Sequence, residues 1–131
     1  MNKKLTQRLF FVTALFFGSI AFATTFDPAE RTQKGHYEIT GNWSELKRGT
    51  NTLVLKITDS NTHEAVAGAA VTVDYDMVEM PTNPPNNAIN ETAPGTYEKV
   101  VFLGMRGQWK FHTLVDKSSL QDEHDQITAV K

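Results

Sequence analysis

Short runs in which inward and outward side chains alternate one by one are the feature that most constrains the fold of this chain. The clearest runs are TLVLKIT at 52–58 and AVTVDYD at 70–76. Alternation with a period of two places successive side chains on opposite faces of an extended strand. The residues expected to face a core are Leu53, Leu55, Ile57, Val71, Val73 and Tyr75. The pattern therefore predicts half-buried β-strands.

Further strand-like runs follow the same pattern and are separated by turn residues. They are HYEITGNW at 36–43, GTYEKVVFL at 95–103, QWKFHTLV at 108–115 and a last run at 126–130. A tight turn is expected at Gly104–Gly107, and no run with helical periodicity follows the N-terminal segment. The total of six or seven short strands predicts an all-β, immunoglobulin-like antiparallel sandwich with the aromatic side chains as core.

The N-terminal segment has the features of an export signal. Lys3, Lys4 and Arg8 precede an apolar stretch at 9–22, and Ala21-Phe22-Ala23 has the small-x-small form of a cleavage site. We expect cleavage after Ala23, with a retained anchor as the alternative. The expected organisation is a signal peptide at 1–23, a flexible leader at 24–34 and one β-sandwich domain at 35–131.

Charge and cysteine content exclude several function classes. The chain has 13 Lys+Arg and 15 Asp+Glu, and removing Lys3, Lys4 and Arg8 leaves 10 against 15, a formal charge of −5. A domain with that charge and no basic stripe is not expected to bind nucleic acid or anionic lipid surfaces. The absence of cysteine excludes thiol catalysis and cysteine-ligated metal sites. No catalytic motif or carboxylate pair is present, so the sequence does not predict an enzyme.

A long segment rich in proline and asparagine, Pro81–Pro94, follows the run at 70–76. It is expected to contain one short edge strand near 88–92, because prolines restrict strands to sheet edges. Long loops are frequently functional, so this one is a candidate binding loop. Its candidate residues are Pro81, Asn83, Pro84, Pro85, Asn86 and Asn87.

Methionines are the best candidates for a binding site. Met77 and Met80 follow the run at 70–76, and Met105 lies in the predicted turn. If the edge strand exists, strand directions place all three at one end of the sandwich. Thioethers select Cu(I) over harder ions, so the three form a candidate Cu(I) site. Methionine also fills gaps in open cores, and the residues alone favour that packing interpretation.

The four histidines are scattered and lack the repeated spacing of a zinc site. Each is expected to be solvent-exposed. His112 and His36 remain alternative copper ligands in a different arrangement.

Several short motifs follow one another in a characteristic order. Their residues are Gly49, Asn51, Gly68, Ala69, Val71, Gly95, Tyr97, Met105, Gly107 and Trp109. This order resembles the YtkA-like/FixH-like family of exported or membrane-tethered domains, over Gly35–Val115. The resemblance implies an immunoglobulin-like fold, and FixH-like members accompany a copper-transporting pump needed for oxidase assembly. This chain departs from them in its predicted cleavable signal, where those proteins usually keep an anchor, and in its Met-Val-Glu-Met-Pro order, where many relatives read methionine-proline-x-methionine.

Together these features predict a periplasmic accessory or binding module of a Gram-negative type of envelope, with secretion as the alternative. Its expected ligand is transiently bound Cu(I), and its expected partner is an envelope protein or a copper-handling membrane protein. No stable membrane insertion is expected after signal cleavage. The competing hypothesis is a structural protein–protein interaction module with no metal role.

Overall fold

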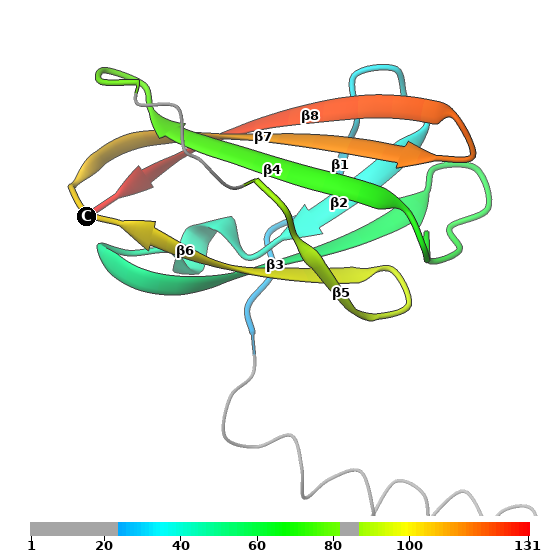
Figure 1. Ribbon diagram of the computed structural model, residues 1–131, viewed down its shortest axis with the longest axis horizontal. Coiled ribbons are helices and arrows are strands. Elements are labelled where there is room, and N and C mark those ends of the chain that lie inside the picture. The colour runs from blue at the N-terminus through cyan, green and yellow to red at the C-terminus, as the bar shows by residue number, and fades with distance from the viewer. Residues whose placement is uncertain (1–23, 82–86) are drawn as a thin grey trace, which may run out of the picture.

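The computed structural model describes residues 24–81 and 87–131, which form two antiparallel sheets packed face to face (Figure 1). The elements are β1 (Glu30–Arg31), β2 (Tyr37–Gly41), the 3-10 helix η1 (Trp43–Glu45), β3 (Gly49–Asp59), β4 (Ala70–Met77), β5 (Asn90–Ala93), β6 (Thr96–Leu103), β7 (Gly107–Lys117) and β8 (Leu120–Val130). One sheet has the order β1-β2-β3-β6-β5 and the other the order β4-β7-β8. The predicted immunoglobulin-like β-sandwich is confirmed. The expected export signal lies outside the described residues.

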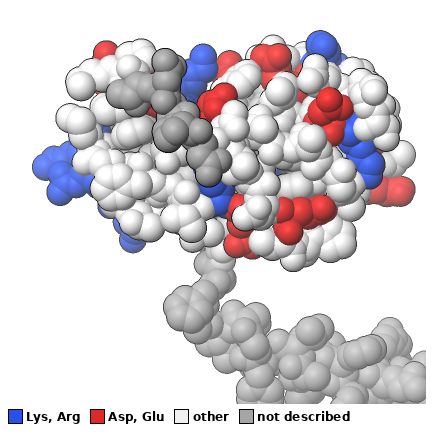
Figure 2. Space-filling model, in the orientation of Figure 1, with Lys and Arg blue, Asp and Glu red and all other residues white. Residues whose placement is uncertain are grey.

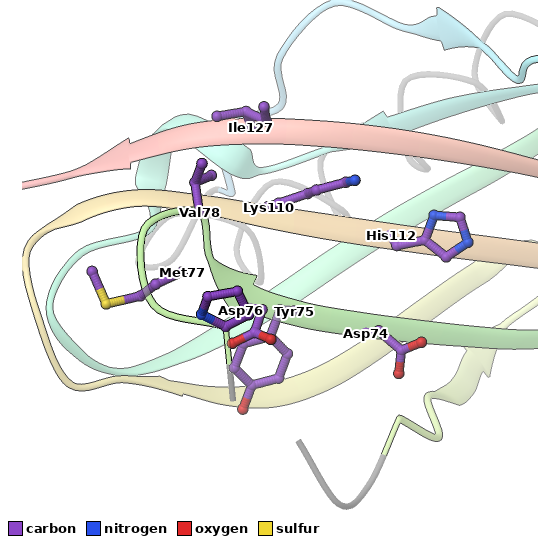
Figure 3. Close-up of a pocket in the computed structure, with 9 residues that line it drawn as sticks. Asp74, Tyr75, Asp76, Met77, Val78, Lys110, His112 and Ile127 are labelled. Atoms are coloured by element: carbon purple, nitrogen blue, oxygen red, sulfur yellow. The ribbon is translucent and has the colours of Figure 1, made fainter. Parts of the chain in front are cut away.

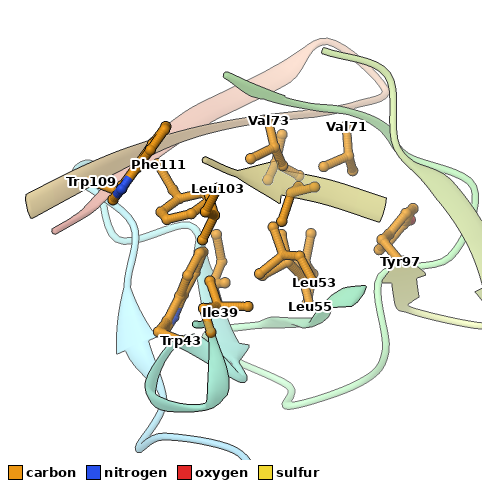
Figure 4. Close-up of a cluster of buried hydrophobic side chains, with 14 of the residues drawn as sticks. Ile39, Trp43, Leu53, Leu55, Val71, Val73, Tyr97, Leu103, Trp109 and Phe111 are labelled. Atoms are coloured by element: carbon orange, nitrogen blue, oxygen red, sulfur yellow. The ribbon is translucent and has the colours of Figure 1, made fainter. Parts of the chain in front are cut away.

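The core lies between the two sheets and includes most of the residues that the alternation placed inward (Figure 4). Leu53, Leu55 and Ile57 of β3 have no exposed surface, and Val73 and Phe111 of the opposite sheet are equally buried. Burying each such side chain stabilises the fold by roughly 1.5–3 kcal/mol. The sandwich is therefore held by apolar contact between the sheets, as a chain without cysteine requires.

Trp43 is a core residue that the strand prediction for 36–43 placed wrongly. Strand β2 ends at Gly41, and Trp43 begins η1, where its ring lies 5.4 Å from that of Phe111. A β-carbon at Gly41 would lie 2.4 Å from the Trp43 ring, so the glycine permits this close approach. The strand ends because the Asn42 side chain bonds to the backbone of Thr52 and Val54 in place of a ladder.

The expected flexible leader at 24–34 is partly ordered structure. Glu30 and Arg31 pair with β2, and Thr32 is buried. The reason lies on β8, where buried Asp122 accepts hydrogen bonds from the Thr32 hydroxyl at 2.6 Å and from the backbone of Lys34 at 2.8 Å. A polar segment is thus fixed by one carboxylate that is distant in sequence.

The predicted edge strand exists, displaced by about two residues to Asn90–Ala93. Strand β5 pairs only with β6, while Ala88 forms an isolated bridge with Thr72 of β4. Between Ala88 and β5 the chain therefore passes from the β4-β7-β8 sheet to the other sheet, at one edge of the sandwich. The Glu91 carboxylate accepts hydrogen bonds from the backbone of Gly68 and Gly95, which joins two loops at this crossing.

The last strand is longer than the predicted one at 126–130. Strand β8 begins at Leu120 and pairs with β7 along its whole length. The connecting residues Ser118 and Ser119 both have positive φ, of 54° and 67°, the backbone of a tight hairpin turn. The prediction missed this hairpin because serine is a weak signal for that turn, and because Asp122 and His124 make the buried face of β8 polar.

Candidate functional site

The three candidate methionines belong to the same end of the sandwich, which we call the methionine end. Met77 closes β4 opposite Trp109 of β7, and Met105 lies in the turn that leads into β7. Met80 follows three residues after Met77. The strand directions on which this prediction depended are confirmed, because β5 lies between β4 and β6 in the chain.

The methionines differ sharply in exposure. Met77 is 7% exposed and belongs to the core, whereas Met80 and Met105 are 55% and 51% exposed. The Met77 side chain points toward the β6–β7 turn (Figure 3), and its methyl group lies 3.0 Å from the position of a β-carbon at Gly107. One methionine therefore packs beneath the turn, and two are available at the surface.

Backbone contacts hold the Met105 turn in place. The Trp109 indole nitrogen donates to the carbonyl of Met105 at 3.0 Å. The amide of Val78 donates to the carbonyl of Gln108 at 2.9 Å, which extends the β4–β7 pairing one residue beyond Met77. The turn is thus anchored through its main chain, and the Met105 thioether is left to solvent.

Of the candidate binding loop, Pro81 and Asn87 are within the described residues. Pro81 is exposed beside the groove described next, and the Asn87 carbonyl accepts from the amide of Val73 at 2.8 Å. Asn83, Pro84, Pro85 and Asn86 lie outside the described residues.

A groove of about 630 Å³ lies on the outer face of the β4-β7-β8 sheet and leads toward the methionine end (Figure 3). Its lining includes Asp74, Asp76, Val78, Lys110, His112 and Ile127. These residues alternate along their strands with core residues, so the predicted outward face of β4 is confirmed. Sequence reasoning did not predict that the face is hollowed, because hollowing depends on the register of three strands.

Charged side chains cross this face in a row. His112 of β7 contacts Asp125 of β8 with 2.5 Å between Nδ1 and the carboxylate, and its Nε2 lies 3.7 Å from Glu123. Burial alone would raise the pKa of Asp125, but His112 and Lys110 outweigh it and hold that pKa below its usual value. The side chain of Asp74, which stands opposite His112 on β4, has no hydrogen bond or ion pair in the part of the chain that the structure describes. The groove therefore carries an acceptor ready for a cationic group.

His124 contradicts the expectation that every histidine is exposed. It is 5% exposed, its Nε2 lies 2.7 Å from the Glu30 carboxylate, and its ring stacks 6.3 Å from that of Trp43. The pairing of β1 with β2 brings Glu30 to it, and that two-residue strand has no sequence signal. Within residues 24–81 and 87–131, no group of three His, Asp or Glu side chains is arranged to hold a metal ion.

Comparison with known proteins identifies the family but no characterised relative. No curated protein and no solved structure matches the chain significantly. In the described part of the chain, no helix has the length and apolar character needed to span a membrane. The sequence matches the YtkA-like family over residues 32–113, which is more than half of the chain. The matched region runs from just before β2 to the middle of β7. The chain belongs to the YtkA-like family.

Proposed function

We propose that this domain is an exported binding module of the cell envelope that takes up Cu(I) transiently at its methionine end. The observation that carries the proposal is the placement of the exposed Met80 and Met105 side chains at the same end as Met77. Exposed methionine is a poor contributor to folding, so two such side chains at one end need a reason outside the core. Binding of a soft ligand supplies that reason.

The ligand chemistry of this end fits a soft monovalent ion. The chain has no cysteine, and its methionines are Met1, Met77, Met80 and Met105. Thioether sulfur favours Cu(I), whereas zinc and magnesium favour imidazole or oxygen. Met80 and Met105 would provide the entry ligands, and Met77, packed beneath Gly107, would join them through a rotamer change of a flexible side chain.

Cu(I) titration under anaerobic conditions, against a chromophoric Cu(I) chelator, tests the proposal. The variant Met80→Leu/Met105→Leu should bind at least about tenfold more weakly than the wild type, and the added change Met77→Leu should weaken binding further. Leucine nearly conserves volume, so circular dichroism should show the same fold in all variants. Equal, weak binding by the wild type and the triple variant would exclude a methionine site.

A second candidate function is protein–protein interaction through the groove on the β4-β7-β8 sheet. The groove supports it because its lining combines apolar Val78 and Ile127 with the unpaired Asp74 carboxylate, which suits an extended segment with a basic residue. In-cell crosslinking should retain such a partner in the presence of a copper chelator. Asp74→Lys should abolish the crosslink, and Glu64→Lys, on the exposed loop before β4, should leave it intact.

A further inference from the structure

A contiguous apolar surface lies on the outer face of β6, next to the methionine end. Val100 and Phe102 are 67% and 63% exposed and stand opposite Thr52 and Thr50 of β3. The Phe102 ring lies against Gly104, one residue before the exposed Met105. Single exposed apolar residues are ordinary, but three large ones close together on one strand and the turn that follows it indicate a contact surface.

Two arginines flank this surface. Arg48 precedes Gly49, which pairs with Leu103 next to Phe102, and Arg106 follows Met105 in the turn. Both are exposed, and neither forms an ion pair with any described residue. Figure 2 shows Lys and Arg side chains projecting from this end, whereas Asp and Glu side chains predominate over the middle and the opposite end. We call Arg48, Val100, Phe102, Met105 and Arg106 the basic apolar tip.

We propose that the basic apolar tip binds the surface of an anionic lipid bilayer. Phe102 and Met105 enter the headgroup boundary, where apolar side chains gain burial, and Arg48 and Arg106 pair with lipid phosphates. The formal charge of −5 expected after cleavage argues against such binding when it is summed over the domain. The local charge at the tip is nevertheless positive, because the pairing of β3 with β6 brings cationic side chains to this end and most carboxylates lie elsewhere.

Charge also distinguishes this occupant from a second copy of the chain. Two tips in contact would bring together the Arg48 and Arg106 side chains of both copies, four cations against the Glu79 carboxylate of each copy, whose Oε2 lies 3.5 Å from the position of a β-carbon at Gly107. A lipid surface provides many phosphates and adapts to a protruding turn. The proposal involves contact at headgroup depth and needs no membrane-spanning segment.

Vesicle co-sedimentation of the exported protein tests this assignment. Expression starts from the full chain, and mass spectrometry confirms that all variants share one N-terminus. The wild type should bind vesicles containing phosphatidylglycerol and release them on raising salt from about 0.05 M to about 0.5 M. Arg48→Gln/Arg106→Gln should weaken binding about 30-fold, and Phe102→Ser about tenfold. The matched control Arg31→Gln/Lys34→Gln removes two cations from the opposite end and should bind as the wild type does.

Three results would overturn the assignment. The first is wild-type binding that is absent, or equal on purely phosphatidylcholine vesicles. The second is an equal loss in the Arg31→Gln/Lys34→Gln control, since net charge alone would then explain it. The third is that the protein does not bind vesicles but forms a dimer, or a complex with another protein, that depends on Phe102. Circular dichroism of each variant separates a lost contact from a lost fold.

Discussion

The two ends of this sandwich are built on opposite principles. At one end, the buried Asp122 carboxylate accepts hydrogen bonds from Thr32, Lys34, His36 and Glu123 and so fixes the β1–β2 turn to β8. We call this the Asp122 end. At the methionine end, the turn is held through the Met105 carbonyl, while its side chain and that of Met80 remain exposed.

The contrast indicates that the Asp122 end contributes to folding stability, whereas the methionine end is available for binding. A buried charge is tolerable only when several donors satisfy it, so the Asp122 end allows little change without loss of folding. Exposed thioethers and a protruding Phe102 contribute little to the folded state, because unfolding exposes them only slightly more. Side chains at the methionine end can therefore rearrange around a ligand at little cost in folding stability, whereas those at the Asp122 end cannot.

The largest expected effect is at the Asp122 end. Asp122→Ala should lower the free energy of unfolding by about 3 kcal/mol, because it leaves buried backbone donors and the Thr32 hydroxyl without their acceptor. Urea denaturation followed by tryptophan fluorescence measures this. Asp74→Ala, at an exposed and unpaired carboxylate, is the matched control and should change stability by less than about 0.5 kcal/mol. Equal effects of the two changes would contradict the special role of Asp122.

The second effect divides the methionine end itself. Met77→Ala should cost about 2–3 kcal/mol because it leaves a cavity beneath Gly107, while Met77→Leu should cost less than about 1.5 kcal/mol. Met80→Ala and Met105→Ala should each stay within about 0.5 kcal/mol of the wild type. Thermal unfolding of the four variants checks the order. A large loss at Met105 would mean that its side chain, not only its carbonyl, holds the turn.

The smallest effect is a dependence on pH. Burial alone would raise the pKa of Asp122, but its hydrogen bonds to Thr32 and to backbone amides outweigh burial and lower it. A carboxyl with a lowered folded pKa contributes stability above its unfolded pKa of about 3.9 and loses that contribution as pH falls through the folded value.

The stability difference between the wild type and Asp122→Asn should therefore be widest near neutral pH and narrow below about pH 4. Comparing the two proteins cancels the other carboxyls with lowered pKa, such as Glu91. Unfolding temperatures measured from about pH 3 to pH 7 show the trend. A difference that stays constant across this range would mean that the Asp122 charge contributes nothing beyond its shape.

Local patterning predicted the strands that have one apolar and one polar face. Leu53, Leu55 and Ile57 are buried as expected, and Tyr97, Val101 and Leu103, which alternate in the same way along β6, are buried too. It failed just after β1, at η1 and in the first half of β8, where the buried side chains are Thr32, Trp43, Asp122 and His124. Each of these is buried through a partner from a distant segment, and no local period marks such a contact.

For the candidate site, the residue types could be read from the sequence, whereas the solvent exposure of each side chain depended on the fold. It placed Met77, Met80 and Met105 at one end once the edge strand was assumed, and β5 confirms that strand. It treated the three methionines as equivalent, whereas the structure buries Met77 and exposes the other two. The basic apolar tip had no counterpart in the predictions, because Arg48 and Phe102 meet only through β3–β6 pairing.

By itself, the sequence determined the fold class, the alternating faces of its strands and the supply of thioethers in a chain without cysteine. These properties follow from side-chain period and chemistry, which act over a few residues. Only the tertiary structure decided which carboxylate is buried, which methionine is accessible and where the positive charge gathers. Burial and electrostatic potential depend on what lies within several ångströms in space, and in this sandwich those neighbours come from strands up to 94 residues apart in the chain, as with Glu30 and His124.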